Sequence, residues 1–118
     1  MRITLYGIPN CDTVKKARTW LETRGIAYTF HDFKKAGISA ELVADWLKDV
    51  DWGGLVNRKG TTWRGLDPVR KEAIVDAASA TALMLETPSI VKRPVLVKDG
   101  RTHVGFADAS YQQIFEKP

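Results

Sequence analysis

The sequence predicts an α/β domain in which a βαβ unit, a run of helices and a final ββα unit follow one another. Three observations predict it. A short apolar run, MRITLY, is followed by glycine and proline and then by a helical pattern. Amphipathic patterns fill the middle of the chain. Near the end, two apolar runs flank a two-residue Asp-Gly link, which is typical of a β-hairpin.

The first elements are a strand, a helix and a second strand. Residues 3–6 are β-prone, and glycine and proline stop them. Between residues 12 and 24, Val14, Ala17 and Leu21 share one helical face, and Gly25 is a good C-terminal stop. Residues 27–33, AYTFHDF, are expected to form the second strand. Two strands joined by a helix favour a right-handed parallel βαβ unit.

Helices are predicted for most of the middle of the chain. Ser39 is an expected N-cap for a helix over residues 40–50, which has one apolar face. Residues 53–65, GGLVNRKGTTWRG, are interpreted as an ordered loop. Two more helices are expected, one from Asp67-Pro68 toward Ala78 and one capped by Ser79 that ends before Pro88.

The chain is expected to end in a hairpin and a helix. Residues 94–97 and 102–104 are the predicted strands on either side of Asp99-Gly100. A short helix over residues 109–115 should bury Ile114 and Phe115.

Length and composition favour one soluble domain spanning residues 1–118. The net charge of +4 weakly favours anionic partners, but the basic residues are dispersed, so no nucleic-acid partner is expected. There is no apolar run of membrane-spanning length and no signal peptide, so we expect a cytoplasmic protein without a membrane partner. One cysteine and two distant histidines predict no metal site. Nothing demands more than a monomer.

The single cysteine, Cys11, is the strongest candidate for chemistry. It lies in GIPNCDTVKKA, where the first strand ends and the helix begins. Free N–H groups and the positive end of the helix dipole stabilise a thiolate there, and helix N-termini lower cysteine pKa values. Lys15 and the Thr13 hydroxyl can add to this effect, whereas Asp12 opposes it. The alternative is an inert, buried cysteine, which the polar turn with Pro9, Asn10 and Asp12 disfavours.

Three segments carry a resemblance to a known family. They are ITLYGIPNCDTVKKA, LVNRKGTTWRGLD and LMLETPSIVKRPVLV, in this order along the chain. Together they resemble the arsenate reductase (ArsC)/Spx family of bacterial thioredoxin-like proteins, and in particular its YffB-type members. The resemblance implies a thioredoxin-like fold, βαβ plus ββα around a mixed four-stranded sheet, with a helical insertion at about residues 38–86.

The same resemblance implies roles for residues far from Cys11. Pro94 corresponds to a cis-proline that faces the catalytic cysteine. Arg93 corresponds to an arginine that holds an anionic substrate, and a guanidinium fits an oxyanion or a carboxylate of glutathione. Arg58 falls near a second active-site arginine, although Asn57 also fits that position. The expected substrate or glutathione contacts are Asn10, Asp12, Thr13, Lys15, Arg58, Arg93 and Pro94.

The chain also departs from the family pattern. Arsenate reductases of this class have a histidine before the cysteine and a third late arginine, where this chain has Gly7 and Gly105-Phe106. Spx-type regulators often have a CxxC pair, but the corresponding residues here are Cys11-Asp12-Thr13-Val14. An internal disulfide switch is therefore excluded.

A single cysteine needs a second thiol from elsewhere to complete a redox cycle, and glutathione is the expected donor. The sequence therefore predicts a glutathione-dependent thiol oxidoreductase, with glutathione as co-substrate and a thiol or oxyanion as substrate. The alternatives are an Spx-like regulatory protein that binds a partner without catalysis, a weak arsenate reductase, and a fold without a redox role.

Overall fold

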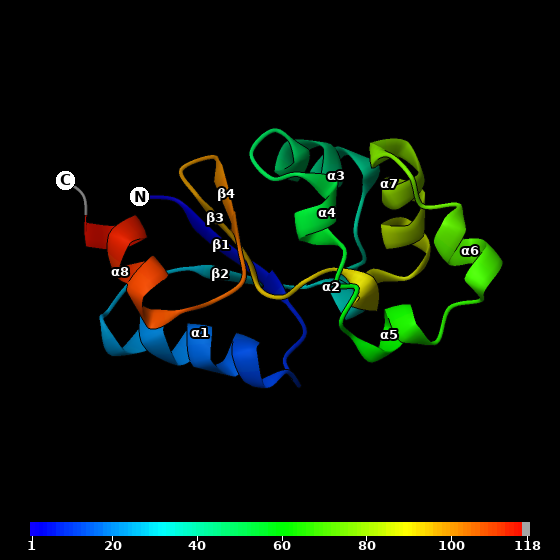
Figure 1. The fold of residues 1–118 in the computed structure, drawn as a ribbon. Helices are drawn as coiled ribbons and strands as arrows, with labels where there is room; N and C mark the ends of the chain where they lie inside the picture. Colours follow the sequence, from blue (N-terminus) through cyan, green and yellow to red (C-terminus); the bar gives the residue numbers. More distant parts are fainter. Residues whose placement is uncertain (117–118) are drawn as a thin grey trace. The chain divides into compact units, whose positions relative to one another are not determined.

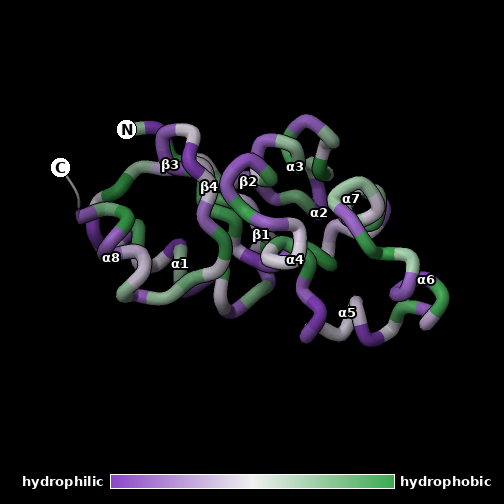
Figure 2. Tube along the Cα trace, turned by 45° about the horizontal axis from the view of Figure 1, so that its top comes forward, coloured by the Kyte–Doolittle hydropathy of each residue, from purple (hydrophilic) through white to green (hydrophobic). Residues whose placement is uncertain are grey.

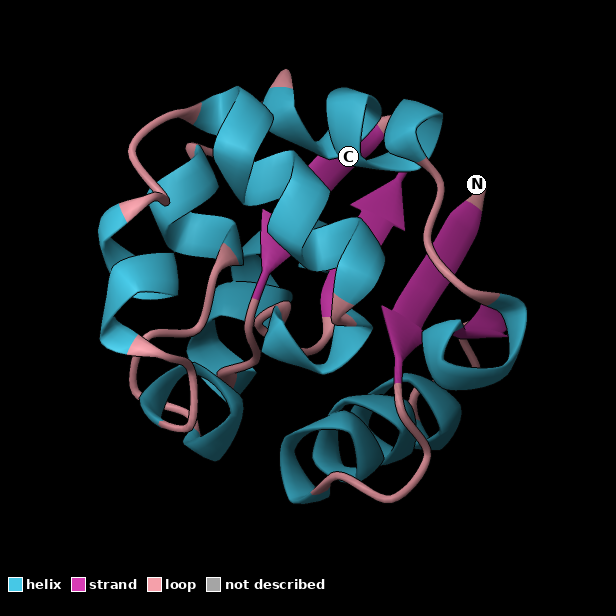
Figure 3. Cartoon of the chain, turned by 90° about the vertical axis from the view of Figure 1, so that its right-hand side faces the viewer, coloured by secondary structure: helices cyan, strands magenta, loops and turns pink. Residues whose placement is uncertain are grey.

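The chain folds into two compact units (Figure 1). One consists of Met1–Asp32 together with the chain from Arg93 onward, and the other is Phe33–Lys92. The computed structural model describes residues 1–116. The first unit contains all four named strands together with α1 and α8, and the second is built from short helices; Figure 3 colours the strands magenta and the helices cyan. The predicted helical insertion at residues 38–86 lies inside the second unit.

The first unit is organised by a four-stranded mixed sheet with the order β2-β1-β3-β4. Strand β1 (Ile3–Gly7) pairs in parallel with β2 (Thr29–Asp32) and antiparallel with β3 (Val95–Lys98). Strand β4 (Arg101–Val104) pairs antiparallel with β3. This arrangement confirms the predicted thioredoxin-like fold class.

The β3–β4 connection is the predicted two-residue hairpin. Asp99 and Gly100 have φ angles of 50° and 84°. A type I′ turn requires positive φ at both central residues, and its twist matches that of the flanking strands. The Asp-Gly dipeptide therefore sets the register, in which Lys98 lies opposite Arg101.

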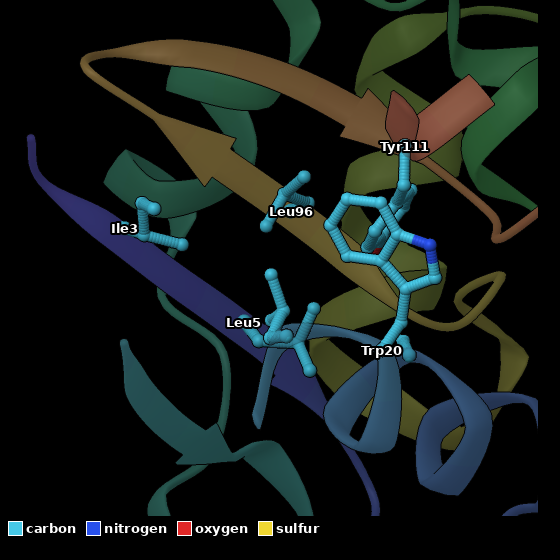
Figure 4. Packing of buried hydrophobic residues seen from close by; sticks show 7 residues of the cluster. Ile3, Leu5, Trp20, Leu96 and Tyr111 are labelled. Carbon is cyan, nitrogen blue, oxygen red and sulfur yellow. The ribbon is translucent and has the colours of Figure 1, made fainter. Parts of the chain in front are cut away.

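Two helices bury one face of this sheet. Helix α1 (Asp12–Thr23) contributes Ala17, Trp20 and Leu21, and helix α8 (Asp108–Glu116) contributes Tyr111. They pack against three strand residues, Ile3, Leu5 and Leu96 (Figure 4).

The residue that α8 buries differs from the prediction. Tyr111 is fully buried, whereas Ile114 and Phe115 are only partly buried. The indole N–H of Trp20 donates to Asp108 Oδ1 over 2.7 Å, which attaches the start of α8 to α1. The Tyr111 ring then packs edge-on against the Trp20 ring, at a centroid distance of 5.4 Å.

The second unit consists of α2 (Phe33–Ala36), α3 (Ala40–Leu47), α4 (Trp52–Leu55), α5 (Thr61–Arg64), α6 (Pro68–Glu72), α7 (Ala77–Glu86) and η1 (Pro88–Ile90). Helix α7 packs against α3, α4 and η1. Figure 2 shows hydrophobic and hydrophilic residues alternating along these helices, as expected where one face is buried. The fully buried residues here include Trp46, Leu55 and Leu83.

Several element boundaries differ from the sequence predictions, including the end of α3, which lies at Leu47 and not at residue 50. The segment interpreted as a loop, residues 53–65, contains α5 and all but the first residue of α4, and each of these helices is a single turn. The second strand ends at Asp32, because Phe33 begins α2 and is buried. Helix α7 is capped by Asp76 and not by Ser79: the Asp76 carboxylate accepts from the Ser79 N–H, and Ser79 Oγ accepts from the Asp76 N–H. The preceding helix, α6, ends at Glu72 and not near Ala78 as predicted.

Candidate functional site around Cys11

Cys11 lies at the point where β1 has ended and α1 begins. It is the N-cap residue of α1, with extended backbone angles of φ −138° and ψ 125°. Its carbonyl accepts the first helical hydrogen bond, from the N–H of Lys15 over 2.9 Å. Because the N-cap side chain faces the free N–H groups of the first turn, this position suits an anion. The thiol is partly exposed, so a reactant can reach it.

Arg93 and Pro94 reach the same end of the sheet from β3. Tyr6 of β1 pairs with Val95 of β3, so Pro94 comes level with the end of β1 in this register. The peptide bond between Arg93 and Pro94 is cis, as the resemblance implied. The Pro94 carbonyl accepts from the N–H of Gly105 over 2.8 Å. The Arg93 side chain lies at the Cys11 thiol and interacts with it by hydrogen bonding and by charge.

These neighbours set the ionisation of the thiol. Partial burial of Cys11 is the largest single effect, and it raises the pKa because it disfavours the charged form. The backbone N–H of Val14, the Arg93 guanidinium and the backbone N–H of Thr13 act in the opposite direction. Together they outweigh burial, so the pKa of Cys11 lies below its ordinary value. Cys11 makes no side-chain capping hydrogen bond in this structure, so the Val14 and Thr13 N–H groups act as nearby dipoles whose positive ends favour the charged thiolate over the neutral thiol.

The structure brings some of the predicted site residues to the thiol. Arg93 and Thr13 both act on Cys11, although Thr13 does so through its backbone N–H. Asn10 and Asp12 are exposed on either side of the cysteine. The exposed Lys15 lies one turn along α1 and lines a shallow groove on that helix together with Lys16 and Thr19.

Sequence reasoning missed the Val14 N–H and the packing that fixes it. Val14 is completely buried in the first turn of α1. A Cβ atom built on Gly7 would lie 2.8 Å from Val14 Cγ2, so the two residues are in direct contact. A strand glycine often marks a close approach of backbone, which is the one sequence feature that could have indicated this contact.

Arg58 belongs to the helical unit and is exposed there. Its guanidinium lies over the Trp52 ring at 5.1 Å and over the Trp63 ring at 5.7 Å. These cation–π contacts restrain a side chain that would otherwise sample many rotamers. Arg64, in the same segment, donates to the Lys59 carbonyl over 2.5 Å.

The positions that depart from the arsenate reductase pattern carry no polar side chain in the structure. Gly7 is buried at the end of β1. Gly105 has a φ of 85°, which disfavours any residue with a side chain. Phe106 packs against the hydrophobic core, with its ring centroid 4.7 Å from that of Tyr111.

Two further properties concern residues 1–116. No group of three or more histidine, cysteine, aspartate or glutamate side chains is arranged to hold a metal ion in this part of the chain. None of its helices has both the length and the apolar character that crossing a membrane requires.

The fold and the site define a thioredoxin-like protein with one activated cysteine at a helix N-terminus. Comparison with known proteins places it further: the ArsC family model matches residues 6–114, and the chain belongs to the ArsC family. An uncharacterized protein of Haemophilus influenzae is 39% identical over 113 residues, covering 96% of this chain and 98% of that protein.

Solved structures and a second curated relative agree with this assignment. The structure of the YffB protein is 50% identical, with a TM-score of 0.89 over 94% of this chain and 96% of that one. An arsenate reductase (ArsC) related protein from Brucella melitensis is 56% identical, with a TM-score of 0.77 over 99% of this chain and 97% of that one. The global transcriptional regulator Spx 2 of Lactococcus lactis is 27% identical, over 88% of this chain and 79% of its own length.

Proposed function

We propose that this protein is a glutathione-dependent thiol reductase in which the Cys11 thiolate is the nucleophile. The observation that carries the proposal is the partly exposed Cys11 at the start of α1, whose thiolate is stabilised by Arg93 and by two backbone N–H groups. A lowered pKa together with exposure is the property that separates reactive cysteines from buried structural ones. Membership of the ArsC family supports the same chemistry.

The proposed reaction is a thiol–disulfide exchange in two displacements. Cys11 Sγ attacks the glutathione sulfur of a mixed disulfide between a substrate thiol and glutathione. The Cys11–glutathione S–S bond forms, the substrate S–S bond breaks, and the substrate leaves as a thiolate that takes a proton from water. The thiolate of a second glutathione then attacks the bound glutathione sulfur. Cys11 leaves as a thiolate, and the products are the reduced substrate and oxidised glutathione.

Arg93 has two tasks in this scheme. Its charge keeps Cys11 ionised as nucleophile and as leaving group, and its planar fork can pair with a carboxylate of glutathione. Asn10, Asp12 and Thr13 are the proposed contacts to the rest of the tripeptide, with Pro94 beside them. Lys15 is exposed one turn away and is proposed to attract the second carboxylate.

Arg58 remains a proposed anion-binding residue of the helical unit. Its restraint between Trp52 and Trp63 supports this, because an ordered guanidinium loses less side-chain entropy when an anion binds. The proposal also includes a monomeric protein in the cytoplasm, where glutathione is the principal small thiol, without nucleic acid, membrane or metal as partner.

The direct test combines binding with turnover. Glutathione is titrated into the labelled protein, and backbone amide shifts are followed by NMR. We expect the shifts to cluster on the residues around Cys11 and Arg93. Reduction of a glutathionylated peptide is then compared between the wild type, Cys11→Ser and Thr19→Ser. Cys11→Ser should fold and lose turnover, because a hydroxyl is a far weaker nucleophile at neutral pH. The Thr19→Ser control, exposed on the same helix, should retain turnover. Wild-type turnover by Cys11→Ser would refute the proposal.

A second candidate function is a regulatory protein that binds a partner without catalysis. The curated relatives named global transcriptional regulator Spx favour it, at 24–28% identity. The rate of iodoacetamide alkylation across pH separates the two functions. A slow thiol with an ordinary pKa favours the regulatory protein, and a fast thiol with a lowered pKa favours the reductase.

Arsenate is expected to be a poor substrate. Gly7, Gly105 and Phe106 supply none of the polar groups that the resemblance led us to look for at these positions. Robust glutaredoxin-coupled arsenate reduction by the purified protein would contradict this expectation.

A further inference from the structure

The last residue of β1 and the first turn of α1 touch through a glycine and a valine. The contact leaves no room for a side chain at position 7: an added Cβ would lie 2.8 Å from Val14 Cγ2 and 3.3 Å from Val14 Cγ1. Val14 cannot easily give way, because it is completely buried and its β-branched side chain has few rotamers. The two methyl groups of Val14 therefore rest directly on the backbone at the end of the strand.

The same valine belongs to the turn that supports the reactive sulfur. Cys11 is the N-cap, and its carbonyl accepts from the N–H of Lys15 over 2.9 Å, which closes the turn around Val14. Val14 is the third residue of α1, the position whose N–H an N-cap side chain faces, and this N–H favours the ionised form of the Cys11 sulfur. A rigid turn leaves that N–H little freedom to move, so its position relative to the sulfur depends on where the Val14 side chain is seated.

We propose that Gly7 is a positioning residue for the Cys11 chemistry: by presenting bare backbone to Val14, it seats the first turn of α1 so that the Val14 N–H is held at the Cys11 sulfur. The inference rests on the proposed function of Cys11 as a nucleophile. Gly7 has no side chain of its own to offer the thiol, so the proposed effect passes through its contact with Val14.

The contact also bears on why position 7, four residues before the cysteine, contributes no side chain to the site. Because position 7 cannot hold a larger residue while Val14 is present, no side chain at this position can share in ionising the thiol. The backbone of the first turn and Arg93 perform that task together. Gly7 and Val14 are therefore expected to behave as a pair when either is changed.

The test is a cycle of variants read out by the thiol pKa. The variants are Gly7→Ala, Val14→Ala and the double change, with Gly65→Ala as control. Gly65 has an ordinary φ of −80°, and a Cβ there would come no closer than 3.4 Å to its nearest neighbour. The pKa comes from the alkylation rate of Cys11 as a function of pH, with folding checked by amide NMR.

We expect Gly7→Ala to raise the thiol pKa by about one unit, because the turn is displaced and the Val14 N–H then stabilises the charged form less. Val14→Ala should raise the thiol pKa by a smaller amount, because the loss of the two valine methyl groups loosens the packing between β1 and the first turn of α1. The double variant should return toward the wild-type value, because the new Cβ at position 7 occupies the space that the valine methyls have vacated. The Gly65→Ala control should leave the pKa unchanged.

Each outcome has a defined meaning. If the wild-type pKa is depressed and Gly7→Ala does not change it, the inference is wrong while the proposed function stands. A double variant with a pKa as high as that of Gly7→Ala also refutes the inference. If Gly7→Ala fails to fold, Val14→Ala is compared with the double variant: a pKa of the double variant closer to the wild-type value supports the inference, and one equal to or above that of Val14→Ala refutes it. An ordinary pKa in the wild type would instead overturn the proposed function.

Discussion

Replacement of Arg93 should change the reactivity of the thiol in opposite directions at low and high pH. Arg93 acts on Cys11 through a hydrogen bond and through its charge. A hydrogen bond to a charged group contributes roughly 1.5–3 kcal/mol, and one pKa unit corresponds to about 1.4 kcal/mol. Because Cys11 is partly exposed, solvent screens the interaction. We therefore take the lower end of this energy range and expect Arg93→Ala to raise the pKa of Cys11 by about one unit.

The direction in which the pKa of Cys11 changes depends on which form of the thiol the arginine stabilises. A positive guanidinium favours the thiolate, so its loss moves the pKa upward toward the ordinary value. Below both pKa values the thiolate fraction falls about tenfold for one unit. The remaining thiolate is about threefold more nucleophilic, because nucleophilicity rises with pKa. The alkylation rate should therefore fall about threefold at low pH and rise about threefold above both pKa values.

The assay is iodoacetamide alkylation of the folded protein, followed by intact mass at several pH values and two salt concentrations. Arg93→Lys keeps the charge but loses the planar fork, so its curve should lie between those of the wild type and Arg93→Ala. The higher alkylation rate of the wild type at low pH should become smaller as the salt concentration rises, because salt screens the charge of Arg93. Arg2→Ala is the matched control, since it removes the same charge from an exposed position. Identical rate profiles for the wild type and both Arg93 variants would show that Arg93 does not act on the thiol.

Two predictions concern the packing of α8. Tyr111→Phe should leave the free energy of unfolding unchanged or raise it by up to about 2 kcal/mol, because the buried Tyr111 hydroxyl has no hydrogen-bond partner among residues 1–116. Tyr28→Phe is its control and should be destabilising, since the Tyr28 hydroxyl donates to a carboxylate; urea unfolding measures both, and a clear loss of stability in Tyr111→Phe would contradict the reasoning. Asp108→Ala should destabilise the fold by roughly 1–3 kcal/mol, because it leaves the indole N–H of the nearly buried Trp20 without its acceptor. Thermal unfolding checks this, with the exposed Asp45→Ala as a control, and equal midpoints would contradict it.

Local chemistry was enough to predict the elements of the first unit. Helix α1 has a clear apolar period, and the Asp-Gly link leaves little choice of turn, so both were predicted close to their observed bounds. The short helices α4 and α5 were missed because a single turn has no period to detect. The sequence predicted Ser79 as the N-cap of α7, but the structure has Asp76 there. Aspartate and serine are both good N-caps, so the sequence alone could not decide between them.

In the candidate site, too, some features could be predicted from the neighbouring sequence and others could not. The position of Cys11 at a helix N-terminus followed from its neighbours in the sequence. The approach of Arg93 came from the family resemblance, because no local pattern links residues so far apart in the chain. The role of the Val14 N–H could not be predicted, since a backbone donor has no residue type of its own. Its effect depends on the Gly7 contact, which appears only when strand and helix are packed.

The central position of β1 has a consequence for how the chain acquires its structure. Its neighbour β2 follows soon after it, but its other neighbour, β3, is a distant part of the chain, with Ile3 opposite Lys98. During synthesis, the edge of β1 that pairs with β3 therefore stays unpaired until the whole helical segment and β3 have emerged from the ribosome. Pairing over such a separation is slow, because much of the chain must be ordered before the contact forms. A compact helical segment shortens the distance between the two strands, so early folding of residues 33–92 would hasten closure of the sheet.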